Sequence, residues 1–220
     1  MLRLARRTFH LRNLPLKCFQ KRMCNLYSMT ATVDELRRVF GSFAGDAANL
    51  PSFGDIYPNR SAPVLRAEGG DRALDLMTWG FRGPASGGGR PLRNVRNLAS
   101  SFWRSKVKNP ERRCIVPVTK FCEWTAEVDP ATKRKRKIWF GLQEAEQSVL
   151  AFAGIWRPAE EGRAMAFLTC EANQLVGANH LKAMPVILDP ADVRRWLTDE
   201  MANACSLAVP FPDERMRQFA

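Results

Sequence analysis

Short apolar stretches of strand length, separated by turn residues, are the feature that most restricts the fold of this 220-residue chain. They are rich in β-branched and aromatic residues, which is the pattern of strands joined by turns. No connection has the pattern of a strand–helix–strand crossover, so we expect an α+β fold with a mainly antiparallel, barrel-like sheet and a few peripheral helices. The predicted strands are residues 73–81, 113–124, 137–142, 149–156, 164–170 and 185–188.

Three segments have the spacing and capping residues of short helices. Thr32 and Glu35 form a capping-box pair ahead of an apolar periodicity that reaches Phe40. The Asp189–Pro190 pair combines a capping side chain with proline at the first helical position, which predicts a second helix from that point. A third helix is predicted over residues 97–106.

The balance of charged residues favours a polyanionic partner. The formal net charge is +12, and seven of the basic residues lie in residues 1–22, which contain no acidic residue. The remainder is still basic, a property of many nucleic-acid-binding proteins and of many proteins that bind none. The run Lys133–Lys137 overlaps one of two predicted loops, residues 83–91 and 125–136. It is either a contact to DNA phosphates or only a solvated loop.

Residues 1–22 differ in composition from the rest of the chain. They are rich in arginine and free of acidic residues, which is typical of a mitochondrial transit peptide or a disordered leader. A third interpretation is that translation starts at Met23. We therefore expect residues 1–22 to be a basic leader, disordered or not part of the mature protein, and residues 23–220 to form a single domain.

Apolar runs, cysteines and histidines restrict the environment and the cofactors. The longest apolar runs, such as residues 149–156, have the length of a strand rather than of a membrane span. The six cysteines form no C-x-x-C pair, and only His10 and His180 could join them in a metal site, so we expect no metal and no cofactor. The simplest interpretation is a soluble, monomeric protein with reduced thiols in the cytoplasm.

Four short motifs and a longer fifth contain most of the candidate functional residues. In chain order they are Met23–Tyr27, Trp79–Phe81, Asn94–Asn97, Phe121–Trp124 and Asn179–Leu188. In this order and at these spacings they resemble the motifs of the SOS response-associated peptidase (SRAP) family, over a range from Met23 to about Leu197. The resemblance implies the SRAP fold, with autopeptidase activity and lyase-like Schiff-base chemistry. It also implies covalent bonding to abasic sites in single-stranded DNA. When bound to DNA, the protein would be associated with the nucleoid.

Cys24 is the candidate nucleophile. If Met23 starts translation, its removal leaves Cys24 with a free α-amine beside its thiol. Such an aminothiol condenses with an aldehyde as a Schiff base and then closes a thiazolidine ring, and an abasic deoxyribose supplies the aldehyde. The α-amine has a pKa of about 7.7–8, so a substantial fraction is neutral at physiological pH. The competing interpretation is that Cys24 is a buried strand cysteine.

Glu123 and His180 are the candidate residues for general acid–base catalysis. Glu123 lies in an apolar strand-like stretch, so we expect a half-buried carboxyl with a raised pKa, which suits a general acid. A surface glutamate at a strand end is the alternative. His180 is the only histidine of residues 23–220 and titrates near neutral pH, although a lone histidine can be purely structural. The resemblance implies that Glu123 assists opening of the sugar ring and that His180 shuttles protons to the amine and the Schiff base.

Four further residues are candidates for binding DNA or orienting the reactants. The resemblance implies that the Asn94 amide orients the Cys24 amine or the opened sugar, and that Arg96 grips a DNA phosphate. Trp79 and a turn at Ala62–Pro63 could offer flat faces to bases near the lesion. Trp79 could equally be a core residue.

The chain also departs from the family pattern at several positions. Asn25 and Leu26 follow Cys24 where the family has Gly-Arg, so one basic DNA contact is missing. Residues 97–99, Asn-Leu-Ala, replace the usual Ala-Glu-Thr, which removes a carboxylate, and Lys182 and Ala183 lengthen the histidine motif by one residue. We interpret these changes as those of a subfamily variant.

Three functions remain open from the sequence. The leading one is a crosslinker in which Cys24, Asn94, Glu123 and His180 do the chemistry on single-stranded DNA. If residues 1–22 persist, Cys24 must first be exposed by self-cleavage. The alternatives are a Cys–His peptidase that acts on other proteins, for which a Cys24 thiolate would need no free amine, and a protein that binds single-stranded DNA without covalent chemistry.

Overall fold

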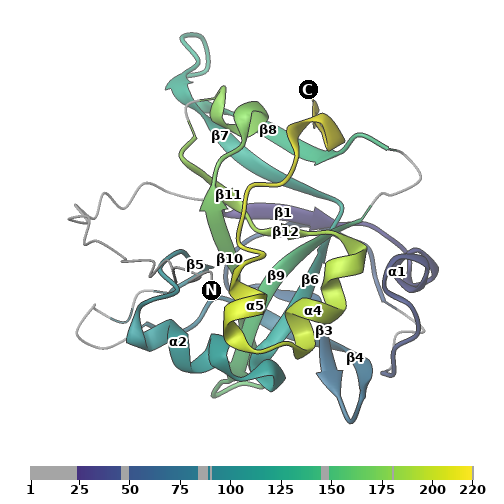
Figure 1. Cartoon of the computed structure of the whole chain (residues 1–220). Coiled ribbons are helices and arrows are strands. Elements are labelled where there is room, and N and C mark those ends of the chain that lie inside the picture. The colour runs from purple at the N-terminus through teal and green to yellow at the C-terminus, as the bar shows by residue number, and fades with distance from the viewer. Residues whose placement is uncertain are drawn as a thin grey trace, which may run out of the picture.

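The strands form two sheets around one hydrophobic core (Figure 1). The computed structural model describes residues 24–45, 50–83, 89, 91–144, 149–179 and 181–219. In the first sheet every neighbouring pair is antiparallel. Its strands are, in order, β13 (Met216–Phe219), β8 (Lys135–Leu142), β7 (Lys120–Val128), β1 (Leu26–Met29) and β2 (Phe53–Ile56).

The second sheet closes on itself. Its strands are, in order, β11 (Ala183–Pro185), β10 (Arg163–Glu171), β4 (Asp71–Trp79), β3 (Ser61–Glu68), β6 (Arg113–Val118), β9 (Leu150–Pro158) and β12 (Ile187–Leu188), with β5 (Asn94–Val95) beside β10. Because β10 pairs with β9 as well as with β4, five of these strands form a ring. Among the described strands of this sheet, only the pairs of β10 with β4 and β5 are parallel. The predicted α+β class with a mainly antiparallel, barrel-like core is confirmed.

The helices are short and lie around the sheets. The α-helices are α1 (Val33–Phe40), α2 (Ser101–Lys108), α3 (Gln174–Gly177), α4 (Val193–Thr198) and α5 (Met201–Cys205), and three 3-10 turns are η2 (Pro110–Arg112), η3 (Pro190–Asp192) and η4 (Asp213–Arg215). In Figure 1, α2, α4 and α5 lie on the side of the ring where α4 contacts β6 and α2 contacts β9. α1 lies at the right of the view, with α2 at the left and α4 and α5 between them.

Local capping signals located two of the three predicted helices. The Thr32 side chain accepts a hydrogen bond from the Glu35 N–H, and the Glu35 carboxylate accepts one from the Thr32 N–H at 2.6 Å, so the capping box is complete. The second predicted helix is present as η3 followed by α4, with Pro190 in its first turn, but the Asp189 side chain forms no capping hydrogen bond. The third begins at Ser101, later than expected, because Asn97 holds a turn through bonds to Ala99 and Ser100.

One strand prediction and one loop prediction are wrong in detail. The stretch 113–124 is two strands, because the chain passes from the second sheet to the first at Thr119. There the Thr119 N–H and hydroxyl both donate to the Ser28 carbonyl, at 2.8 and 2.9 Å. The loop predicted over residues 125–136 is mostly a hairpin of β7 and β8. Most of the loop predicted at 83–91 lies outside the described residues.

The core between the sheets is a chain of aromatic rings. Tyr27 meets Trp79 edge-on at 5.0 Å between ring centroids, and Trp79 stacks on Phe167 at 5.1 Å. Phe152 continues the contact from Phe167 at 5.2 Å, and Phe121 follows at 5.7 Å. Tyr27 and Phe121 are also paired across β1 and β7. The start of β1, and with it Cys24, is therefore fixed against the rigid centre of the molecule.

The described residues contain neither a candidate membrane span nor a candidate metal site. No helix in this part of the chain is long and apolar enough to cross a membrane. No three His, Cys, Asp or Glu side chains among these residues are grouped so that they could hold a metal ion.

Candidate active site

Cys24 lies two residues before β1 and is almost completely buried, with 1% of its surface exposed. The pairing of Leu26 with Cys122 holds it beside β7. Its thiol donates a hydrogen bond to the Leu26 carbonyl at 3.6 Å. Burial raises the pKa of the thiol well above its ordinary value, and the nearby Glu123 carboxylate raises it further. The thiol is therefore protonated at neutral pH.

Glu123 lies against the main chain of Cys24. It is 3% exposed, which is deeper than the half-buried position expected for it. Burial raises its pKa from 4.5 to about 8, and a hydrogen bond from the Cys24 backbone N–H lowers it by a smaller amount. Its Oε1 atom is buried and has no partner among the described residues. At neutral pH the side chain is mostly a carboxylic acid and can give up a proton.

Asn94 contacts the main-chain carbonyl of Cys24, whereas Glu123 contacts its main-chain nitrogen. Its Nδ2 donates a hydrogen bond to the Cys24 carbonyl at 3.2 Å. The pairing of Asn94 with Phe167 fixes β5 alongside β10, which positions the amide. Its Oδ1 is buried without a partner among the described residues. Three of the sequence-predicted residues, Cys24, Asn94 and Glu123, are thus brought together.

Trp79 and Pro63 are not where a base could stack. Trp79 has none of its surface exposed and its indole N–H donates to the Arg93 carbonyl at 3.1 Å, so the predicted base-stacking role is wrong and the core alternative is observed. The predicted turn at Pro63 is also wrong, because Pro63 is buried within β3 and pairs with Leu76. Pro63 is tolerated there because pairing of β3 with β6 begins only at Leu65.

The remaining candidates are distributed around this centre. Arg96 is exposed and follows directly after β5, two residues from Asn94. His180 lies outside the described residues, but its neighbours Asn179 and Leu181 are described and both are half-buried. The basic run Lys133–Lys137 is exposed on the hairpin of β7 and β8.

The sequence did not identify Trp124 as a contact of the segment after the nucleophile. Its indole N–H donates to the Asn25 side-chain oxygen at 3.0 Å, and the two residues are 99 positions apart. Asn25 stands where the SRAP pattern has glycine, so this departure was the available signal. The contact fixes the residue after Cys24 on β7.

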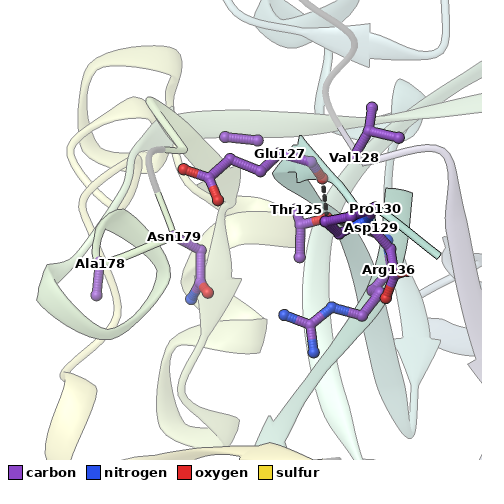
Figure 2. Close-up of a pocket in the computed structure, with 9 residues that line it drawn as sticks. Thr125, Glu127, Val128, Asp129, Pro130, Arg136, Ala178 and Asn179 are labelled. Carbon is purple, nitrogen blue, oxygen red and sulfur yellow. Dashed lines mark hydrogen bonds between the residues drawn. The ribbon is translucent and has the colours of Figure 1, made fainter. Parts of the chain in front are cut away.

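A pocket of about 250 Å³ lies beyond Glu123 along β7 (Figure 2). It is bounded by the end of β7, the start of β8 and the segment after α3. Its lining residues are Thr125, Ala126, Glu127, Val128, Asp129, Pro130, Arg136, Ala178 and Asn179. Since Thr125 follows Glu123 by two residues on β7, the pocket begins close to Glu123 along the same strand.

Comparison with known proteins supports a specific family. Residues 23–220 match the family model described as SOS response associated peptidase (SRAP). The chain is 25% identical over 214 residues to the abasic site processing protein YoqW of Bacillus subtilis (strain 168), covering 90% of this chain and 91% of YoqW. It matches the protein of the same name from Bacillus phage SPbeta equally well.

Solved structures show the same fold. A protein from Bacteroides thetaiotaomicron aligns with a TM-score of 0.71 at 21% identity, over 89% of this chain and 91% of that protein. A phage-related protein from Bordetella bronchiseptica aligns with a TM-score of 0.71 at 19% identity, over 89% of this chain and 93% of that protein.

Proposed function

Because the chain belongs to the SOS response associated peptidase (SRAP) family, we propose that it acts on abasic sites in single-stranded DNA and forms a thiazolidine crosslink through an N-terminal Cys24. Two relatives carry the name abasic site processing protein, which supports the substrate. Residues 1–22 would be a leader outside a single domain of residues 23–220, and the protein would act as a cytoplasmic monomer.

The observation that carries the proposal is the convergence of polar groups on the main chain of Cys24. Glu123 accepts a hydrogen bond from its backbone nitrogen, and Asn94 donates one to its carbonyl oxygen. In a chain that begins at Cys24, that nitrogen is the α-amine. Because Glu123 positions the nitrogen of Cys24, the site is suited to chemistry in which the amine reacts before the sulfur.

The reaction would proceed in two bond-forming steps. The neutral amine of Cys24 attacks the aldehyde carbon of the opened sugar, and the oxygen leaves as water with one proton from the amine and one from Glu123. The Glu123 carboxylate then takes the second amine proton, which leaves the neutral imine. The sulfur then attacks the imine carbon while its proton passes to the nitrogen, which closes the ring. Asn94 Oδ1, buried without a described partner, is suited to accept from the amine or a sugar hydroxyl. His180 would shuttle protons between the amine and the Schiff base.

The raised pKa of the Cys24 thiol favours this order of events over a peptidase that acts on other proteins. Such a peptidase needs a thiolate, whereas burial and Glu123 hold the thiol protonated. In the proposed reaction the sulfur acts second and within the same residue, so its effective concentration is high without ionisation.

If residues 1–22 are present when the protein is made, the same groups would release Cys24. Its thiol attacks the carbonyl carbon of the adjacent Met23, and the peptide C–N bond breaks. The departing amine takes a proton from Glu123, and the Glu123 carboxylate formed in this way takes the thiol proton. Water then hydrolyses the thioester. Arg96 and the exposed run Lys133–Lys137 would supply contacts to DNA phosphates.

The decisive experiment is a crosslinking assay. The chain starting at Met23 is produced, mass spectrometry verifies that Cys24 is N-terminal, and the protein is incubated with a single-stranded oligonucleotide that has one abasic site. Denaturing electrophoresis should show a shifted band. The band should be absent with Cys24→Ala or an intact-base oligonucleotide, and slower to form with Glu123→Gln.

Cys122→Ala is the matched control, since Cys122 is a buried cysteine of the adjacent strand. It should crosslink like the unsubstituted protein. Absence of any band, with salt-sensitive binding kept in native gels, would reject the covalent mechanism in favour of passive binding. Cleavage of unrelated peptides by a Cys24-dependent activity would favour the peptidase.

A further inference from the structure

A β-bulge in β7 creates the pocket beyond Glu123. Trp124 pairs with Lys137, but the next pair is Val128 with Lys135, so β7 has two more residues than β8 in this interval. The Thr125 hydroxyl replaces the missing ladder bonds, because it accepts from the Arg136 N–H at 3.0 Å and donates to the Glu127 carbonyl at 2.7 Å. Bulges are frequent beside active sites, where they redirect side chains.

The side chains in this pocket offer acceptors on one side and donors on the other. Figure 2 shows the ends of Glu127, Asn179 and Arg136 around a common space. The Asn179 Nδ2 atom already contacts the Leu175 carbonyl at 3.4 Å and Gln218 Oε1 at 3.3 Å, so its Oδ1 is the atom left to accept. Glu127 and Arg136 are exposed. The positive charge of Arg136 also contributes to lowering the pKa of the Asp129 carboxyl, after the hydrogen bonds from the Thr132 and Ala131 N–H groups.

This combination fits a nucleobase better than a phosphate. A phosphate near Arg136 would be repelled by the carboxylates of Glu127 and Asp129. Guanine, in contrast, has two N–H donors on its Watson–Crick edge, suited to a carboxylate, and O6 and N7 acceptors, suited to a guanidinium. A volume of about 250 Å³ is near the lower end of small-ligand pockets, which fits one base rather than a larger ligand.

The pocket is also close enough to Glu123 to bind the base of a nucleotide near the abasic site. At about 3.3 Å per strand residue, Glu127 lies at most about 13 Å from Glu123 along β7. The base would therefore belong to a nucleotide one or two positions from the abasic site.

We propose that this pocket binds a guanine that flanks the abasic site, so that the protein prefers lesions in that sequence context. The inference rests on the proposed function. Cytosine should bind with the second-highest affinity, because its amino group can donate to Glu127 and its O2 can accept from Arg136. Adenine and thymine should bind less well, since neither presents two adjacent donors to the carboxylate.

Non-covalent binding tests the preference without the crosslinking chemistry. Fluorescence anisotropy measures the affinity of the full chain for single-stranded oligonucleotides that have a tetrahydrofuran abasic analogue, which lacks an aldehyde, and each of the four bases at the first and second positions on either side. Guanine at one position should improve Kd about tenfold over adenine or thymine, the scale of a bidentate base contact.

The Glu127→Gln variant should bind the oligonucleotides with all four bases with similar affinity, because Gln replaces one of the two acceptor oxygens with an NH2 donor that opposes a guanine N–H. Arg136→Ala should also abolish the preference. Arg134→Ala removes the same charge from the same hairpin without lining the pocket, so it should lower affinity for every base equally and keep the preference.

Equal affinities for the four bases, or a preference that survives Glu127→Gln, would overturn the guanine pocket. The crosslinking assay separates the two proposals. Crosslinks that form with an aldehyde-bearing site regardless of the flanking base would reject the pocket and leave the proposed function intact. No binding to any oligonucleotide would reject both.

Discussion

At the residue scale, two buried polar atoms at the candidate site have no hydrogen-bond partner among the described residues. Glu123 Oε1 and Asn94 Oδ1 are both in this state, and both side chains hold the main chain of Cys24. An unpaired buried polar atom costs about 1–3 kcal/mol. Such atoms in a folded protein are expected where a ligand or reactant completes the hydrogen bonding.

The raised pKa of Glu123 makes stability depend on pH. Its folded pKa of about 8 exceeds the unfolded value near 4.5, so its protonated form is favoured in the folded state. The associated stability is complete below about pH 4.5 and is lost as the pH rises to about 8. Glu123→Gln should therefore raise Tm relative to the unsubstituted protein at pH 8.5 and have little effect near pH 4.5, as measured by thermal unfolding at both values. The same difference in Tm at both pH values would contradict the shift.

At the scale of elements, one buried arginine joins the helices to the ring of strands. Arg113 of β6 is fully buried and donates to the carbonyls of Val107 at 2.7 Å, Trp196 at 3.0 Å and Asp199 at 2.6 Å. These acceptors lie near the carboxyl ends of α2 and α4, where main-chain carbonyls have no partner within the helix.

Replacing Arg113 should loosen both helices. We expect Arg113→Met to lower the free energy of unfolding by at least about 3 kcal/mol, because three carbonyls lose a charged donor. Urea unfolding measures the loss. Arg104→Met, an exposed position in α2, is the control and should change stability by no more than about 0.5 kcal/mol. Similar losses for the two variants would mean that Arg113 does not join the helices.

At the same scale, β9 and β6 pack so closely inside the ring of strands that a larger side chain does not fit at Gly154. A Cβ at Gly154 of β9 would lie 2.8 Å from the Cys114 sulfur and 3.1 Å from Val116 Cγ2. Gly154→Ala should therefore cost about 1–3 kcal/mol through overpacking, and Cys114→Ala in the same chain should restore part of it. Gly54→Ala, where a Cβ meets nothing within 4 Å, is the matched control. Calorimetric unfolding distinguishes these outcomes.

At the scale of the whole molecule, the distribution of charge should govern affinity for DNA. The run Lys133–Lys137 is exposed at the end of the molecule that contains the pocket, whereas α1 lies on another side (Figure 1). Changing Arg134 and Lys135 to Gln should weaken binding to all single-stranded sequences alike.

The slope of log affinity against log salt should also fall by about 0.7 for each bound phosphate that the substitutions release. The control changes Arg37 and Arg38, exposed residues of α1, to Gln in the same way. It should leave the slope of log affinity against log salt unchanged. A salt titration of anisotropy measures both. An equal change in both variants would show that only net charge matters.

The sequence by itself determined what depends on neighbouring residues. The capping box at Thr32 needs only residues three positions apart, so α1 could be predicted in place. Continuous apolar runs predicted β9 and β10, and the burial of Glu123 followed from the strand around it. The motif order predicted the family and three of the residues that meet at the candidate site.

Only the tertiary structure decided which distant residues meet. The bond from Asn94 to Cys24 spans 70 positions and the bond from Trp124 to Asn25 spans 99, and no local pattern encodes such pairs. The same holds for Trp79, whose ring is covered by Tyr27 and Phe167, and for the bulge that forms the pocket. Burial and register arise from strand pairing over the whole chain, whereas a sequence pattern records only the preference of each segment.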